Sequence, residues 1–221
     1  RSSTIGSKKK FRIEVFDEAS DVTVYDIDNH QIVTSDLLSS ESSFETFPTF
    51  SPDGTSLYFC SSKAVAPMPE RYRDARYSLC RIDFDPEDCT FGSSVDTLYN
   101  ADVKGGSVSF PRISPDGRYL VFTLGGYGNF SIWHKDADLY MIDLQDGTVA
   151  PMHHLNSDDV ESYHSWSSDS RWLVFSSRRD DGLYTKPYIA FIDADGNAHK
   201  PFLLPQKDPK KYYQMQMFSY N

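Results

Sequence analysis

Short apolar runs separated by turn-forming residues recur along this chain and predict β-strands. Three continuous apolar runs lie at residues 57–59, 120–122 and 173–175. Each consists of β-forming side chains, which suits a strand covered on both faces. Each run follows a polar turn, Ser-Pro-Asp-Gly in two cases and Ser-Ser-Asp-Ser in the third. No helical period of comparable strength is present, so the pattern predicts an all-β chain.

These runs belong to a longer repeat in which a short strand, a tight turn and a second strand follow one another. The three copies span residues 47–60, 110–123 and 163–176. Proline presets φ at the first central turn position, aspartate bonds the backbone of its own turn, and glycine accepts a positive φ. The third copy has Ser170 where the others have glycine. We therefore expect a different turn type there.

A second hairpin signal follows each copy, so each unit contains four strands. Asp-Gly pairs after alternating hydrophobic residues mark these hairpins at 146–147 and 195–196. Four strands per repeated unit are typical of a β-propeller blade. The predicted blades are 11–38 (partial), 44–100, 107–156, 161–206 and the start of a further one at 207–221, about four in all.

The single β-propeller domain or fragment over residues 1–221 has two possible arrangements. The last segment could complete the first blade and close a small ring. Alternatively, the chain is the later part of a longer, six-bladed-type propeller. We favour the longer propeller because larger rings are more usual.

Composition and charge narrow the range of partners. Acidic residues outnumber basic ones, 32 to 22, which gives a formal charge of −10. A net anion repels phosphate backbones and anionic membrane surfaces, so we expect no nucleic-acid partner. No apolar run approaches the roughly 20 residues of a membrane-spanning helix, so we expect no membrane insertion by this segment.

The three cysteines do not form a disulfide framework, because their number is odd and no CxxC pair is present. Cys80 and Cys89 flank an acidic turn and could face each other across a hairpin. Otherwise the cysteines are small buried hydrophobic residues.

The Ser-Pro-Asp-Gly-x-x-Leu-x-Phe unit resembles the WD40-like (PD40) repeat of TolB β-propeller proteins. This resemblance covers the chain from Phe11 to Leu204. Residues 128–139, 161–167 and 175–182 look like Bacteroides-type TolB-like proteins. This resemblance implies a periplasmic or envelope-associated protein, often with a lipid anchor upstream. It also implies a binding or scaffold role, because TolB docks protein partners through its propeller and such relatives usually lack demonstrated catalysis.

Several candidate binding residues fall where one rim of a propeller is expected. They are Trp133, His134, Glu161, Tyr163, His164, Arg178 and Arg179. The connector 125–135 is long for a hairpin loop, and long loops are often functional. Arginines beside tryptophan and histidine suit carboxylate or sugar recognition through forked hydrogen bonds and stacking. In the alternative interpretation the histidines satisfy backbone groups and the arginines pair with Asp180 and Asp181.

We expect no metal or other cofactor. His134, Glu161 and His164 are conceivable zinc or manganese ligands, but nothing in their spacing demands a metal. The stretch 193–197 superficially resembles a calcium loop, but Leu204 stands where the bidentate glutamate should be, so a hairpin turn remains.

The sequence thus supports two main functions. No Gly-x-Ser-x-Gly elbow, P-loop or His-Glu-x-x-His motif is present. The first hypothesis is a non-catalytic propeller that binds a protein, peptide or glycan. The second is a polysaccharide (uronate) lyase or hydrolase with a metal or acid/base site in the channel. A purely structural domain of a larger envelope protein is a third possibility.

Overall fold

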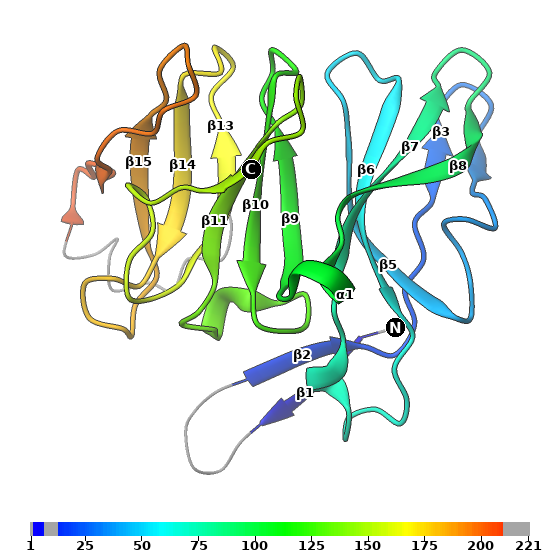
Figure 1. The fold of residues 1–221 in the computed structure, drawn as a ribbon, viewed down its shortest axis with the longest axis horizontal. Helices are drawn as coiled ribbons and strands as arrows, with labels where there is room; N and C mark the ends of the chain where they lie inside the picture. Colours follow the sequence, from blue (N-terminus) through cyan, green and yellow to red (C-terminus); the bar gives the residue numbers. More distant parts are fainter. Residues whose placement is uncertain (1, 7–12, 210–221) are drawn as a thin grey trace. The chain divides into compact units, whose positions relative to one another are not determined.

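The computed structural model describes residues 2–6 and 13–209 and consists mainly of antiparallel strands (Figure 1). The chain divides into two compact units, Arg1–Pro111 with Gly126–Phe130 and Arg112–Gly125 with Ser131–Asn221. The boundary runs through strand β9 (Ser107–Ile113). No helix of the described part is both long and apolar enough to cross a membrane.

Most elements of the described residues are strands. Before β9 lie β1 (Ser2–Gly6), β2 (Ile13–Asp17), β3 (Val24–Asp26), β4 (Gln31–Val33), β5 (Ser43–Phe50), β6 (Ser56–Lys63), the 3-10 helix η1 (Tyr72–Asp74), β7 (Ser78–Asp85), β8 (Thr90–Tyr99) and α1 (Ala101–Lys104). After it lie β10 (Tyr119–Gly125), η2 (Ser131–Trp133), β11 (Asp138–Asp143), β12 (Val149–Pro151), β13 (Glu161–Trp166), β14 (Trp172–Ser177), β15 (Lys186–Phe191) and β16 (Phe202–Leu203).

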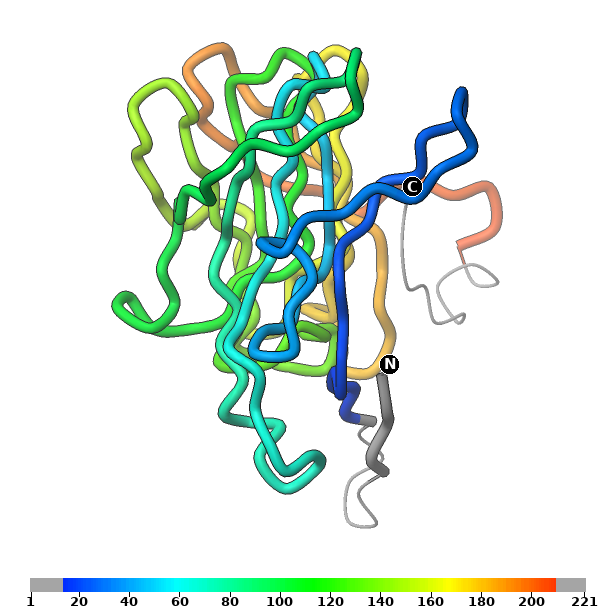
Figure 2. The backbone as a smooth tube through the Cα atoms, turned by 90° about the vertical axis from the view of Figure 1, so that its right-hand side faces the viewer, coloured from blue at the N-terminus to red at the C-terminus, as the bar shows by residue number. Residues whose placement is uncertain are grey.

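Three sheets have four strands each, in the orders β5-β6-β7-β8, β12-β11-β10-β9 and β13-β14-β15-β16. Strands that are consecutive in the chain are neighbours in each sheet, as hairpin-connected blade strands must be. The pairs β1-β2 and β3-β4 form two-stranded sheets. The predictions of an all-β chain and of about four blades are confirmed. The connector between β6 and β7 extends beyond the ends of both strands (Figure 2).

The N-terminal part pairs differently from the expectation. The apolar segments 11–16, 22–27 and 32–34 of the predicted partial blade 11–38 are expected to be its three outer strands. Instead β2 pairs with β1, and β3 pairs only with β4 among the described strands. The predicted pairing in this partial blade is therefore wrong, because the segment before residue 7 supplies β2 with a partner. The expected strand at 212–218 lies outside the described residues.

The Ser-x-Asp turns of the three repeats have the same structure, which corrects the expectation of a different turn at Ser170. The residue at the glycine position has φ of 74° at Gly54, 75° at Gly117 and 59° at Ser170. In each turn this residue's N–H donates to the carbonyl of the repeat's serine three residues earlier. Serine therefore adopts the left-handed conformation here at a cost that glycine would avoid.

The first strand of each repeat carries an aromatic residue with positive φ: 52° at Phe47, 53° at Phe110 and 48° at Tyr163. Strand register shifts at this point in β5 and in β13, so the residue forms a β-bulge. A left-handed aromatic residue is uncommon, and its recurrence at matching positions makes the bulge a property of the repeat.

Each unit has its own apolar core. In the first unit Leu57 and Phe59 of β6 pack with Cys80 and Ile82 of β7. In the second unit Leu173 and Phe175 of β14 pack with residues of the neighbouring strands, among them Val121 of β10. These are the runs that the sequence pattern marks as covered strands.

None of the three cysteines forms a disulfide, so the possible Cys80–Cys89 bridge is absent. Strand register explains this result, because Cys80 lies opposite Thr97. Cys89 stands in the turn between β7 and β8 with φ of 51°. Cys60 and Cys80 are buried, as expected of small hydrophobic residues, and Cys89 is half-buried.

Candidate functional site

The candidate site lies in the second unit, beyond the ends of strands β10 and β14. These strands run in the same direction, so the residues that follow them emerge at the same end (Figure 1). Trp133 comes from η2, after β10, and Arg178 directly follows β14. The Arg178 guanidinium lies 4.9 Å from the centroid of the Trp133 ring. The two predicted residues therefore meet.

Arg178 keeps hydrogen-bonding capacity in this stacked position. One terminal nitrogen, Nη2, donates to the carbonyl of Gly182. Its Nε is buried and has no hydrogen-bond partner among the described residues. Arg178 forms no close ion pair among the described residues, but its charge acts on Asp181, whose pKa is lowered mainly by the Tyr184 and Leu183 N–H groups and also by Arg178. A guanidinium that is fixed by an aromatic face and donates no hydrogen bond to a described carboxylate is suited to bind a carboxylate.

Glu161 and Arg179 form a second, buried pair. Arg179 Nη2 lies 3.0 Å from Glu161 Oε1, and the Glu161 side chain is fully buried while that of Arg179 is 18% exposed. Ser157 and Ser177 hydroxyls donate to the same oxygen at 2.6 and 2.7 Å. The Ser157 N–H donates to the other oxygen at 2.9 Å.

This carboxylate therefore holds the turn before β13 and the end of β14 together. Burial raises the pKa of Glu161, while the serine hydroxyls and Arg179 act in the opposite direction. Arg179 also donates to the Leu155 carbonyl and lies over the Tyr188 ring, 4.5 Å from its centroid. All these contacts are internal, which is the pattern of a structural pair.

The expected pairing of the two arginines with Asp180 and Asp181 is not observed. Lys186 pairs with both aspartates instead, at 2.9 and 3.8 Å. Lys186 is the first residue of β15 and lies opposite Ser177 of β14, which brings its ammonium group to this turn.

The two predicted histidines are buried. His164 Nε2 donates to the Val121 carbonyl at 2.8 Å, so this side chain links β13 to β10. His134 is 2% exposed, and its backbone closes the turn after η2. No group of three His, Cys, Asp or Glu residues in the described part could hold a metal ion.

Tyr163 occupies the bulge of β13 and is half-buried. Burial raises the pKa of its phenol, which therefore stays protonated at neutral pH.

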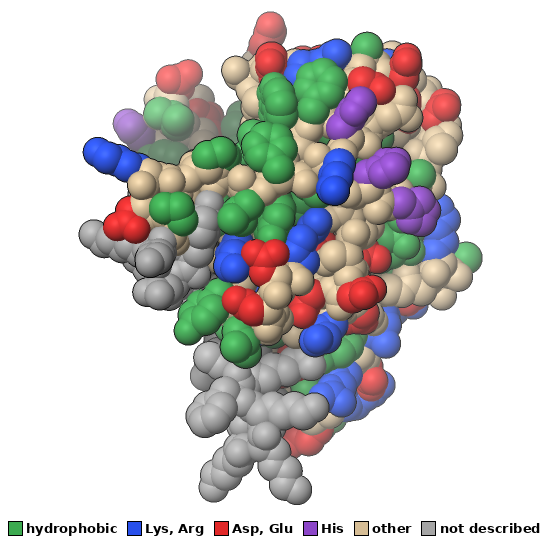
Figure 3. All heavy atoms as spheres, turned by 90° about the vertical axis from the view of Figure 1, so that its left-hand side faces the viewer, with side chains coloured by type: hydrophobic (Ala, Val, Ile, Leu, Met, Phe, Trp, Pro, Cys, Tyr) green, Lys and Arg blue, Asp and Glu red, His purple; other side chains and the backbone are tan. Residues whose placement is uncertain are grey.

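A groove in the second unit was missed by the sequence reasoning. It has a volume of about 490 Å³ and lies between the end of β11 with β12 and the turn that follows β15. His153 and His154 stand in a turn after β12 and line this groove. Histidine side chains and acidic ones lie near one another on this side of the unit (Figure 3). No local pattern could reveal it, since residues about fifty positions apart form its two walls.

Comparisons with known proteins show the fold. A scan of protein-family models finds no match, and a search of curated proteins finds none either. Among solved structures, TolB from Acinetobacter baumannii matches 80% of this chain with a TM-score of 0.50 and 20% identity. An oligogalacturonate lyase in complex with manganese matches 92% with a TM-score of 0.59 and 12% identity. A puromycin-hydrolysing peptidase of Mycobacterium tuberculosis matches 93% with a TM-score of 0.56 and 13% identity.

The chain spans 36%, 53% and 30% of the lengths of these three proteins, respectively. It is a β-propeller chain whose fold is similar to that of TolB.

Proposed function

We propose that this chain is a non-catalytic, TolB-like binding module of the bacterial cell envelope, of the Bacteroides type with WD40-like repeats. Its ligand is a protein, peptide or glycan that presents a carboxylate to Trp133 and Arg178. The observation that carries the proposal is the Arg178 guanidinium, which is stacked 4.9 Å from the Trp133 ring centroid and has a buried Nε without a partner in the described residues.

The chemistry of this pair favours a planar anion. Stacking on the indole face holds the guanidinium in one orientation, so little freedom is lost when a carboxylate binds. A sugar ring could extend this contact across the indole, and an acidic peptide could do so with its backbone. Both ligand classes therefore use the same anchor.

The groups that a lyase would use support the non-catalytic form of the proposal. Glu161 is fully buried and accepts four hydrogen bonds within the protein. His164 is engaged with the Val121 carbonyl. A general acid or base must reach the proton that it transfers, and these two side chains face the interior of the unit.

Binding experiments with four variants test the proposal. Calorimetric titration would use oligogalacturonate, its methyl ester, and an acidic peptide with its amidated counterpart. We expect one ionised ligand to bind and its neutral counterpart to bind at least about tenfold more weakly. Arg178→Ala and Trp133→Ala should each weaken binding about tenfold or more, and Arg178→Lys should recover only part of it.

Arg171→Ala is the matched control, because Arg171 also lies over an aromatic ring of the second unit, 5.4 Å from the Phe191 centroid. It should leave affinity unchanged. The proposal fails if no carboxylate ligand binds saturably, or if Arg171→Ala has the same effect as Arg178→Ala. If the chain cleaved oligogalacturonate in the presence of added manganese, and if His164→Ala abolished this cleavage, the lyase hypothesis would replace the binding proposal.

A further inference from the structure

We propose that the groove between β12 and the turn after β15 is a second binding site, which takes a basic side chain of an extended peptide. The site belongs wholly to the second unit and is distinct from the Trp133–Arg178 pair. Its volume of about 490 Å³ falls in the range of ligand pockets. Its walls combine an apolar floor with an acidic rim.

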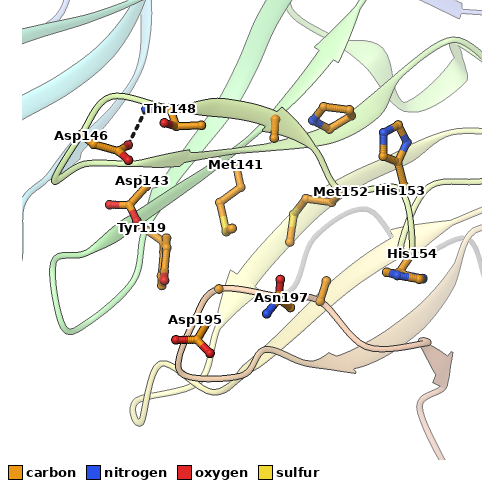
Figure 4. A pocket seen from close by; sticks show the side chains of 14 residues that line it. Tyr119, Met141, Asp143, Asp146, Thr148, Met152, His153, His154, Asp195 and Asn197 are labelled. Carbon is orange, nitrogen blue, oxygen red and sulfur yellow. Dashed lines mark hydrogen bonds between the residues drawn. The ribbon is translucent and has the colours of Figure 1, made fainter.

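The floor is formed by two methionines and a buried tyrosine. Met152 is 5% exposed, and Met141 is half-buried beside it. Both side chains point into the groove, toward the side where Tyr119 and Asn197 lie (Figure 4). Flexible thioether side chains adapt to varied apolar partners, so this floor suits the aliphatic part of a peptide.

The Tyr119 hydroxyl is the polar group that points to a ligand. Its side chain is 4% exposed, and its Oη has no hydrogen-bond partner among the described residues. A buried hydroxyl without a partner is costly, and a ligand that bonds it would remove that cost. Gly196 lies against the ring, since a Cβ there would come within 2.7 Å of Oη. The turn with Asp195 is thus held beside the phenol.

The charges around this hydroxyl select a cation. Asp143, Asp146 and Asp195 line the groove, and no lysine or arginine is among its lining residues. Arg118 pairs with Asp143 at 3.3 Å, and its guanidinium lies 4.7 Å from the centroid of the Tyr119 ring. Asp146 and Asp195 form no ion pair among the described residues, so the groove keeps two carboxylates against this one cation. Asp146 accepts the Thr148 N–H at 2.8 Å, which lowers the pKa of its carboxyl and keeps it ionised. A lysine or arginine side chain would place its charge between these carboxylates and its stem on the methionines.

The two sites are far enough apart to be tested separately. Tyr119 begins β10, while Trp133 lies beyond its other end. A strand of seven residues spans roughly 20 Å. The acidic groove and the arginine–tryptophan pair also select ligand groups of opposite charge.

The experiment uses methionine methyl groups as local reporters. The chain is labelled with ¹³C-methyl methionine and titrated with a blocked Ala-Leu-Arg-Leu-Ala peptide, and with the same peptide carrying citrulline in place of arginine. We expect the Met141 and Met152 signals, assigned with Met141→Leu and Met152→Leu, to shift with the arginine peptide. The citrulline peptide should bind at least about tenfold more weakly.

Three variants locate the contacts. Asp146→Asn/Asp195→Asn should weaken binding about tenfold or more and reduce its salt dependence. Tyr119→Phe should weaken it about threefold to tenfold, since one hydrogen bond is lost. Asp158→Asn, at an exposed carboxylate outside the groove, is the matched control and should have no effect.

The inference is overturned if neither methionine signal moves, if the citrulline peptide binds equally well, or if the double aspartate variant binds as the parent does. Occupation by a second copy of the chain would also overturn it and would appear as a concentration-dependent mass without peptide. Arg178→Ala should leave binding of the basic peptide intact. Failure of this site therefore leaves the proposed function standing, and the reverse is also true.

Discussion

Arg179 places its Nη2 3.0 Å from Glu161 Oε1, and the glutamate side chain has no exposed surface. Removing one partner leaves the other charge uncompensated, which costs about 3–5 kcal/mol for buried pairs. We predict that Arg179→Met lowers the free energy of unfolding by about 3 kcal/mol at neutral pH, measured by urea denaturation. Glu161→Gln should cost less, because its amide oxygen still accepts the serine hydroxyl bonds.

The double variant tests whether the two side chains act together. Glu161→Gln/Arg179→Met should cost less than the sum of the single changes, with a coupling of about 0.5–3 kcal/mol. Lys63→Ala is the control, since the Lys63–Asp102 pair is 84% and 54% exposed. Such surface pairs contribute about 1 kcal/mol or less. Purely additive single changes would contradict the assignment of a coupled pair.

The same pair shows where sequence reasoning succeeds and where it stops. Local patterns predict the strands of the three full blades, because turn residues and apolar runs are sequence-local. The convergence of Trp133 with Arg178 also followed from their places after the second strands of successive blades. The partner of Arg179 did not follow, since the register that sets Glu161 opposite Ser177 is fixed by the fold. Sequence proximity favoured Asp180 and Asp181 instead.

Two further features depended on three-dimensional context. The hydroxyl of Ser170 accepts a hydrogen bond from the Asp116 N–H at 3.0 Å. This bond stabilises serine at a position where the left-handed backbone conformation favours glycine. The groove required two hairpin turns of successive sheets to lie side by side. Neither contact leaves a periodic signal in the chain.

Ser170 allows a prediction in which strain and hydrogen bonding oppose each other. Glycine would remove a left-handed cost of about 1–2 kcal/mol and lose one hydrogen bond worth about 1 kcal/mol. Ser170→Gly should therefore stay close to the parent in stability, as followed by thermal and urea unfolding. Ser170→Ala keeps the strained backbone and loses the bond, so it should be about 1–2 kcal/mol less stable than Ser170→Gly.

Gly117→Ala, in the equivalent turn with φ of 75°, is the control for strain alone. It should lower the free energy of unfolding by about 1–2 kcal/mol. An alanine at 170 that matched or exceeded glycine in stability would contradict the shared turn structure.

The turn aspartates predict a loss of stability in acid. Asp53 accepts the Ser51 hydroxyl at 2.5 Å and the Thr55 N–H at 3.1 Å, and these bonds lower its pKa below the ordinary 3.8. Asp169 has its pKa lowered by the matching contacts with Ser167 and Arg171. A lowered folded-state pKa means that the unfolded chain binds the proton first as pH falls.

The contribution of these carboxylates is thus complete above about pH 4 and is lost as pH falls through their lower folded-state pKa values. At pH 5 the Asp53→Asn/Asp169→Asn variant should have a lower free energy of unfolding than the parent. This difference should shrink as the pH falls to 2, as measured by urea denaturation. Asp158→Asn, at an exposed position, should run parallel to the parent throughout. If the free energy of unfolding of the turn variant ran parallel to that of the parent over this pH range, the turn aspartates would not explain the loss of stability in acid.

Cysteine reactivity gives a last prediction that needs no variant of the core. Cys60 and Cys80 have exposures of 0% and 5%, and burial raises the pKa of Cys80 to about 11. Since the thiolate is the reacting form, Cys80 should resist alkylation in the folded protein. Cys89 is half-buried in a turn, so iodoacetamide at pH 8 should modify Cys89 first, and the other two only after unfolding, as peptide mapping by mass spectrometry would show. Folded Cys89→Ser protein should stay unlabelled over the same period. If Cys80 were labelled as fast as Cys89 in the folded parent, strand β7 would have to open in the folded state, which contradicts the prediction.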